Sequence, residues 1–280
     1  MSESTSENPL GILRRRRRDM VLMYVFLIAV ALWWLFPLIT MLRQSLEYGG
    51  VSNFWWVLTH SLNGVHLPRA LLNSLVIAFI DAVLVCAVGS LAGYAFSRIR
   101  FPGREITYTF ALVFLAVPGT AMLVPIYYIT GRLGLFNNYL GVALPEAALT
   151  LPFAILLMRN AFDGLSDSLF EAASIDGAGH FRKYFSVALP LVVPTMMNLG
   201  VLCLMWSMHN FIFPSMLVTN PDMTTAAQAV QSIRGVFAPT PQQTARFFAA
   251  LSVLTIPILV LVVISLRWMR HGIAVGGSKE

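Results

Sequence analysis

Residues 71–97 read LLNSLVIAFIDAVLVCAVGSLAGYAFS and contain a single charged side chain, Asp81. A helix needs about 20 mainly apolar residues to cross the hydrocarbon core of a bilayer, which is about 30 Å thick. Spanning strands would instead show segments of about ten residues with alternating polarity. Because lipid offers the backbone no hydrogen-bond partners, a spanning segment must pair its own polar groups. The stretch therefore predicts a transmembrane helix in an all-α membrane protein.

The rest of the chain repeats this pattern. Charged residues make up 11% of the 280 residues and hydrophobic ones 57%, whereas soluble domains carry about 25% charged residues. This composition excludes a soluble enzyme. We expect six transmembrane helices, at approximately 20–41, 71–97, 106–130, 142–160, 191–214 and 246–267. They form a domain over 20–267 that includes a cytoplasmic loop at 161–189, between a basic N-terminal tail (1–19) and a C-terminal tail (268–280).

Lysine and arginine residues indicate which side of the membrane each loop occupies. With the N-terminus inside, the cytoplasmic segments hold Arg14–Arg18, Arg98, Arg100, Arg104, Arg159, Arg182, Lys183, Arg267, Arg270 and Lys279. The outer segments hold Arg43, Arg69, Arg132, Arg234 and Arg246. This bias follows the positive-inside rule and predicts a multi-pass protein of the cell membrane with both termini cytoplasmic. The arginine run adjoins a transmembrane helix, so it indicates contact with anionic lipid rather than nucleic acid.

Prolines interrupt several of the apolar runs. Pro118 and Pro125, with Gly119 between them, are expected to break the third helix, while Pro152 and Pro257 lie in the fourth and sixth. Irregular backbone at membrane depth is tolerated only where protein or a water-filled cavity surrounds it. A kink buried in helix packing explains any single proline equally well. Three interrupted helices together favour a transport pathway.

The longest cytoplasmic loop predicts a helix–turn–helix. It contains Ser168-Leu169-Phe170-Glu171-Ala172-Ala173-Ser174-Ile175-Asp176-Gly177-Ala178-Gly179. Ser166 or Ser168 is expected to cap the first helix, and Ser168 with Glu171 has the spacing of a capping box. Gly177 is expected to end this helix, because glycine accepts the left-handed conformation of a C-terminal stop. A second short helix, roughly from Gly179 to Val187, is expected to stop before Pro190.

The sequence Glu171-Ala172-Ala173-x-x-Asp176-Gly177-Ala178, followed by Leu189-Pro190-Leu191, resembles the EAA loop of ABC importer permeases. The extended match is similar to the carbohydrate subgroup, which includes the maltose permeases. The resemblance covers nearly the whole chain. It continues at Leu72-Asn73-Ser74-Leu75, at residues 92–104, at Val124-Pro125-Ile126-Tyr127, at residues 133–138 and at Leu151-Pro152-Phe153.

The resemblance implies a type I ABC importer permease fold and a division of labour between subunits. The loop would dock into a cytoplasmic ATPase and transmit its closure, through Glu171, Ala172, Ala173, Asp176, Gly177, Ala178 and Pro190. The implied partners are a second permease, two ATP-binding cassette ATPases and an extracytoplasmic solute-binding protein. The glycine-rich segment 272–279 resembles a tail that inserts between the ATPases; a disordered end explains it equally well. The sequence contains no Gly-x-x-x-x-Gly-Lys-Ser/Thr phosphate loop, so ATP hydrolysis is assigned to the partner. We expect no enzymatic activity, cofactor or metal in this chain.

The expected solute is a sugar or sugar derivative. Aromatic stacking and amide hydrogen bonds suit hydroxylated ligands, and the residues expected to supply them are Asn73, Asn198, Trp206 and Asn210. The family usually has a Trp-Asn-Asp/Glu-Phe-x-Trp-Pro run at the outer end of the fifth helix. Residues 208–214 read MHNFIFP here, with Asn210 in place of the acid. This departure weakens the assignment of a sugar-binding role to the run.

Other functions remain open at this point. Asp81 and Glu146 are acids within predicted transmembrane helices, where charge is costly. They would suit a proton-driven secondary transporter, but that function leaves the loop unexplained; pairing with neighbours or contact with pathway water explains them equally well. His209 is expected to be a packed or interfacial residue. A membrane hydrolase would need a metal or nucleophile cluster, and the five histidines show no ligand spacing. Within the importers, glycerol phosphate, peptides and amino acids remain alternative solutes.

Overall fold

Helices account for most of the computed structural model, which describes residues 17–62, 64–234 and 240–276, with side chains over 20–62, 64–234 and 240–263. In chain order the elements are α1 (Arg17–Ser45), α2 (Ser52–Thr59), β1 (Ser61–Leu62), β2 (Val65–His66), α3 (Leu67–Arg98), α4 (Arg104–Val113), η2 (Phe114–Ala116), η3 (Gly119–Met122), α5 (Leu123–Arg132), α6 (Tyr139–Asp163), α7 (Asp167–Ile175), α8 (His180–Lys183), η4 (Tyr184–Ala188), α9 (Leu189–His209), α10 (Ile212–Leu217), η5 (Pro221–Met223), α11 (Ala226–Ile233) and α12 (Pro241–Gly276). Arg14 to Arg16 of the basic run and Lys279 of the tail lie outside the described residues.

Five of the six predicted transmembrane helices are present as long apolar helices. They are Met20–Ser45, Leu67–Arg98, Tyr139–Asp163, His180–His209 and Pro241–Val263. Leu67–Arg98 and Tyr139–Asp163 extend beyond the predicted limits at both ends and the other three at one end only, because backbone hydrogen bonding continues where apolar content falls. The all-α membrane fold is thereby confirmed.

The third predicted helix is bent rather than straight. Its two halves, Arg104–Ala116 and Gly119–Arg132, meet at 95°. The break falls at Val117, whose φ of −81° and ψ of 118° are extended, as is favoured for a residue before proline. Pro125 does not break the chain. It lies in the first turn of α5, where no intrahelical partner is needed for a backbone N–H.

The expected interruptions of the fourth and sixth helices are wrong. α6 continues through Pro152 and α12 continues through Pro257. Within the described residues, the interruption at Pro118 is therefore the only one of the three that bends a predicted transmembrane helix sharply. A kinking proline costs one helical hydrogen bond, which packing against neighbouring helices can offset.

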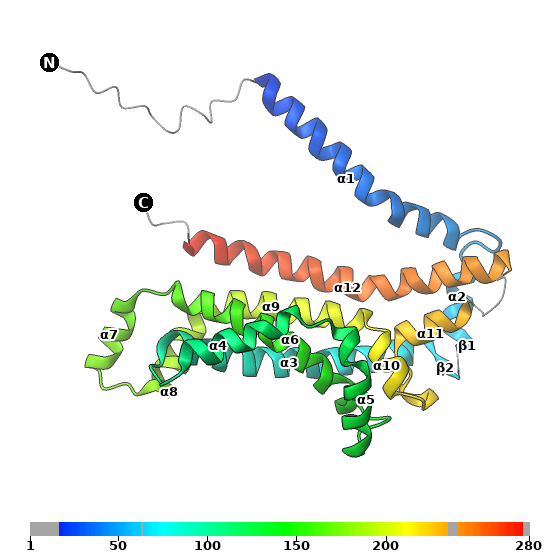
Figure 1. Cartoon of the computed structure of the whole chain (residues 1–280). Helices are drawn as coiled ribbons and strands as arrows, with labels where there is room; N and C mark the ends of the chain where they lie inside the picture. Colours follow the sequence, from blue (N-terminus) through cyan, green and yellow to red (C-terminus); the bar gives the residue numbers. More distant parts are fainter. Residues whose placement is uncertain (1–16, 63, 235–239, 277–280) are drawn as a thin grey trace.

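The centre of the fold is α3, which packs against α6 and α9 over most of its length (Figure 1). Gly89 and Gly93, four residues apart, lie on the side of α3 that faces α6. A Cβ at Gly89 would lie 2.7 Å from the Cβ of Ala154, and one at Gly93 would lie 2.6 Å from the Cβ of Met158. Small residues at this spacing allow helix backbones to approach closely in a membrane.

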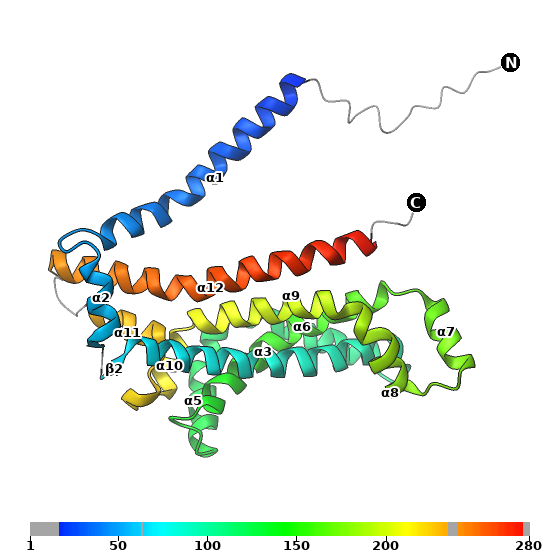
Figure 2. The ribbon, with the colours of Figure 1, turned by 180° about the vertical axis from the view of Figure 1, so that it is seen from behind.

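The two ends of the molecule differ in structure. One end holds α2, α11 and a short hairpin, in which Ser61 pairs with His66 and Leu62 with Val65. The other end is formed by α7 and α8, and the C-terminal end of α12 points toward it (Figure 2). α1 contacts α12, yet its apolar window contains no buried residue. This exposed apolar surface requires lipid or another membrane subunit to cover it.

Candidate functional site

The loop between α6 and α9 projects from one end of the helix bundle. After α6 ends at Asp163, α7 runs over Asp167–Ile175, a turn follows, and α8 begins at His180. Both views show α7 standing out from the remaining helices. The predicted helix–turn–helix is therefore present, and most of its surface is available to another protein.

The turn after α7 has the predicted geometry. Gly177 has a φ of +73°, in the left-handed region that glycine enters without steric cost. The Ala178 N–H donates to the Ala173 carbonyl oxygen at 2.9 Å, and the Gly177 N–H donates to the Ser174 carbonyl oxygen at 3.0 Å. These two bonds form a Schellman motif. They fix the direction in which the chain leaves α7, and Asp176 is the C-cap residue.

The predicted capping box at the start of α7 is absent. Ser166 is the N-cap residue and its side chain makes no cap hydrogen bond. The hydroxyl oxygens of Ser166 and Ser168 instead lie 2.7 Å apart, bonded to each other. Because α7 begins at Asp167, Ser168 already lies inside the helix. It cannot be the N-cap residue of a capping box with Glu171. A carboxylate in the first turn, from Asp167, still favours the helix N-terminus electrostatically.

The expected stop before Pro190 is also wrong. α8 passes into a π turn over Tyr184–Ala188 and continues directly into α9, where Pro190 is the second residue. Proline within a helix clashes with the carbonyl four residues earlier. The wider π turn immediately before it changes the hydrogen-bond register and relieves this clash. α8, the π turn and α9 thus form one uninterrupted helical segment.

The outer face of the loop carries an unengaged carboxylate among apolar side chains. Glu171 is exposed and has no hydrogen-bond or ion-pair partner in the described part of the chain. Ile175 is 88% exposed and Phe181 80% exposed. Ala172 is exposed, while Ala173 packs inward. A projecting surface with exposed apolar residues and a free acid is typical of a protein-binding site.

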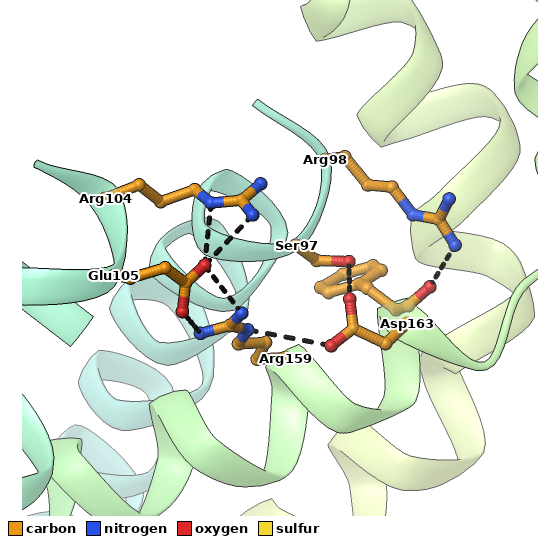
Figure 3. Close-up of polar contacts among 7 residues, drawn as sticks. Ser97, Arg98, Arg104, Glu105, Arg159 and Asp163 are labelled. Atoms are coloured by element: carbon orange, nitrogen blue, oxygen red, sulfur yellow. Dashed lines mark hydrogen bonds and ion pairs between the residues drawn. The ribbon is translucent and has the colours of Figure 1, made fainter. Parts of the chain in front are cut away.

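Charged residues tie the base of this loop to three helices (Figure 3). Arg159 of α6 donates to both carboxylate oxygens of Glu105 of α4, at 3.1 and 2.9 Å. Ser97 of α3 donates to Asp163 at the end of α6, at 2.6 Å. The ends of α3, α4 and α6 beside the loop are therefore held together in one cluster.

Arg98, the last residue of α3, reaches from this cluster into the loop. Its Nη2 donates to the carbonyl oxygens of Phe162 and Leu165, both at 2.6 Å, and its Nη1 donates to Asp167 Oδ1 at 2.5 Å. The sequence placed Arg98 on the cytoplasmic side but gave no sign of these contacts. Its partners lie 64 to 69 residues away in the chain, so a local pattern could not reveal them.

The residues expected to contact solute occupy different environments. Asn73 is 4% exposed and donates to the carbonyl oxygens of Asp222 and Thr224, at 2.9 and 3.0 Å, while it accepts from the Tyr139 hydroxyl. Both hydrogen-bond donors of its amide and its carbonyl oxygen are therefore bonded to other groups of the protein. Among the described residues Asn198 is half-buried and makes no hydrogen bond through its side chain.

The end of α9 offers a more open arrangement. Trp206 is 50% exposed and its ring meets Phe153 edge-on, with centroids 5.5 Å apart. Asn210 is the C-cap residue of α9 and accepts a hydrogen bond from the Phe213 N–H at 3.3 Å. The structure therefore groups Trp206 and Asn210 at the end of one helix, while the hydrogen-bond partners of Asn73 are separate from theirs.

The acids of the transmembrane helices are buried. Glu146 accepts a hydrogen bond from Ser207 of α9, and this bond joins α6 to α9. Asp81 is 2% exposed, and one of its oxygens has no partner in the described part of the chain. His209 instead bonds to the Met205 carbonyl oxygen of its own helix, at 2.8 Å. The interaction of Glu146 matches the expected pairing with a neighbour.

Comparisons with known proteins give consistent results. A family model described as "Binding-protein-dependent transport system inner membrane component" matches residues 85–274. The maltodextrin transport system permease protein MdxG of Bacillus subtilis (strain 168) is 29% identical over 273 residues, which cover 94% of this chain and 98% of that protein. The trehalose/maltose transport system permease protein MalG of Thermococcus litoralis is 27% identical and covers 92% of this chain and 96% of its own.

A solved structure is similar in fold. It is a chain from a bacterial ABC transporter involved in the import of the acidic polysaccharide alginate, with a TM-score of 0.74. The match covers 90% of this chain and 98% of that chain, at 18% sequence identity. At this identity the likeness concerns the arrangement of helices alone.

Proposed function

The chain belongs to the family of binding-protein-dependent transport system inner membrane components, and from this we propose that it conducts a carbohydrate through the membrane as one permease subunit of an ABC importer. It is a transport subunit, and ATP hydrolysis resides in a partner. The observation that carries the coupling role is the loop at 161–189, where an exposed Glu171 stands on a helix fixed by the Schellman turn at Gly177. Such a helix can enter a groove of another protein without rearranging its own backbone.

The proposed solute is a sugar or sugar derivative. Support comes from the maltodextrin and trehalose/maltose transport systems to which the similar permeases belong. Trp206 offers an exposed ring for stacking against a sugar face, and Asn210 and Asn198 offer amides for hydroxyl groups. We no longer include Asn73, because its amide is saturated by buried protein groups.

The proposed assembly contains a second permease, two ATPases and a solute-binding protein. The family description supports the binding protein. The exposed apolar length of α1 supports a membrane partner or lipid beside it. For the ATPases, the support is the exposed surface around Glu171, Ile175 and Phe181. We propose that the coupling set is Glu171, Ala172, Ala173, Asp176, Gly177, Ala178 and Pro190.

A charge reversal tests this function. Glu171→Lys places a cation where a charge-assisted bond to a basic ATPase residue is expected, and such bonds are roughly twice as strong as neutral ones. We expect the variant to insert normally, to lose most of the ATPase in a pull-down from the membrane, and to abolish uptake. The measurement pairs pull-down with uptake of labelled maltodextrin in cells carrying the whole transport system.

Glu47→Lys is the matched control. It makes the same charge reversal at the opposite end of the molecule, where Glu47 pairs weakly with Arg43, and it should retain ATPase. Normal ATPase attachment and normal uptake by Glu171→Lys would refute the coupling role of the loop. Transport by this chain reconstituted alone would refute the proposed class of importer.

A further inference from the structure

We propose that Arg98 is a positioning residue that makes α7 move together with the transmembrane helices when the ATPase moves the loop. This inference rests on the proposed function, because it requires an ATPase docked on α7. It goes beyond that function by naming the connection through which movement passes.

A stripe of α3 supplies the connection. Ser90, Tyr94 and Arg98 follow one another at intervals of four residues and so lie on one face of the helix. Ser90 Oγ lies 2.7 Å from the Tyr184 hydroxyl oxygen in a buried bond. The Tyr94 hydroxyl donates to the His180 carbonyl oxygen at 3.4 Å. Ser90 and Tyr94 therefore attach α8 and the π turn to α3, and Arg98, the last residue of the same stripe, contacts α7.

Arg98 contacts three consecutive parts of the chain: the end of α6, the turn after it and α7. It bonds to the carbonyl oxygens of Phe162 and Leu165 near the end of α6, where orphan carbonyls attract a cation. It bonds to Asp167 in the first turn of α7, and its guanidinium lies 4.3 Å from the centroid of the Phe170 ring. Only a planar group with several donors can satisfy carbonyls, a carboxylate and an aromatic face together, so lysine is a poor substitute.

The exposure of the partners shows which contacts matter. The Arg98 side chain is 14% exposed, whereas Asp167 is 83% exposed. An ion pair with so exposed a partner contributes little to stability. The two carbonyl bonds fix the guanidinium at the end of α6 and the turn after it, and the Phe170 contact is its more sheltered contact with α7. Removal of Arg98 should therefore let α7 shift relative to α3 and α6 when the ATPase moves it, while its resting position, the Schellman turn and the docking face stay intact.

A cluster of polar residues beside Arg98 holds the ends of α3, α4 and α6 together. Arg159 joins α6 to α4 through Glu105, and Ser97 joins α3 to α6 through Asp163. In the described part of the chain, Ser97, Glu105, Arg159 and Asp163 of this cluster (Figure 3) make no polar contact with α7, which is reached by their neighbour Arg98. Within the described residues, Arg98 links these helix ends to α7 through Asp167, and Lys183 of α8 makes a separate link by donating to Ser174 Oγ at 2.6 Å.

The test is a distance measurement between spin labels in the assembled transporter. One label replaces Ser168 on α7 and the other replaces Ile106 on α4, which is 77% exposed; Cys86 and Cys203 are changed to Ala. Each labelled transporter must first retain its ATPase in a pull-down. Distances are then recorded without nucleotide and with ATP plus vanadate, so no transported solute is required.

With Arg98 present, we expect the same narrow distance distribution in both states. Arg98→Ala should match it without nucleotide and shift or broaden it by at least about 2 Å with ATP plus vanadate, since helix shifts at interfaces are of this size. Arg98→Lys should shift less. Arg100→Ala, which removes an exposed arginine two residues away, should behave like the unmodified protein.

Two results would overturn the inference. An Arg98→Ala distribution that is unchanged in both states would show that α7 is held by other contacts. One already broadened without nucleotide would show a purely structural role. Loss of ATPase from the transporter that retains Arg98 would instead refute the proposed function, and this inference with it.

Discussion

Gly177 holds a left-handed backbone in a place where its Cβ would meet nothing within 4 Å. The cost of substitution is therefore conformational and not steric. Left-handed geometry costs an L-residue about 1–2 kcal/mol, asparagine tolerates it best, and a β-branched residue tolerates it least. We expect Gly177→Asn to retain most uptake and ATPase attachment, and Gly177→Val to lose both. Pull-down and uptake, measured on membranes with equal amounts of the chain, distinguish the two; equal behaviour would show that the turn direction is unimportant.

Residues whose roles depend on local sequence were predictable, and those with distant partners were not. Gly177 forms its bonds within four residues, so the pattern Asp-Gly after a helix was sufficient. Asn73 was expected to face solute, yet its partners Asp222 and Thr224 lie 149 and 151 residues away. No local pattern indicates that a buried amide is already satisfied. The same reason hid the contacts of Arg98.

The contact between α3 and α6 leaves little room for added volume. A Cβ at Gly93 would lie 2.8 Å from the Arg159 backbone nitrogen as well as close to Met158, and backbone cannot move aside cheaply. Overpacking of this kind costs about 1–3 kcal/mol. We expect Gly93→Ala to lower the thermal unfolding temperature of the detergent-solubilised transporter and to reduce uptake.

Gly119→Ala is the matched control for this substitution. A Cβ there would lie 3.6 Å from Leu149, an ordinary van der Waals distance. If both variants unfold at the same temperature, close approach of α3 and α6 does not limit stability.

At the level of elements, hydropathy predicted which segments are helical but not how they are shaped. Apolar content is the same on a straight helix and on a bent one, so the 95° turn between α4 and α5 was outside its reach. Proline was also an unreliable guide. Pro118 bends the chain, while Pro152 and Pro257 lie in continuous helices, because the outcome depends on what packs around each ring.

Over the whole molecule, the arrangement of helix ends agrees with the expected topology. The basic residues Arg98, Arg104 and Arg159 lie near one another (Figure 3), and Arg98 bonds to Asp167 of α7. The C-terminal end of α12 points to the same end of the molecule. Cationic residues are retained preferentially on the cytoplasmic side. We therefore propose that α7 and both termini are cytoplasmic, and that α2, α11 and the hairpin face outward.

Accessibility of introduced cysteines tests this orientation directly. Ile175 on α7 is 88% exposed and Val51 at the other end is 75% exposed, so a thiol at either position can react wherever the reagent has access. In a chain with Cys86 and Cys203 changed to Ala, we expect a membrane-impermeant maleimide to label Val51→Cys in intact cells. It should label Ile175→Cys only after permeabilisation, because the reagent cannot reach a cytoplasmic loop in intact cells. The loop itself does not cross to the outer side, since Arg182 and Lys183 would each cost about 2.5–3.5 kcal/mol in the hydrocarbon. Labelling of position 175 in intact cells would invert the topology and place the loop beyond the reach of any cytoplasmic ATPase.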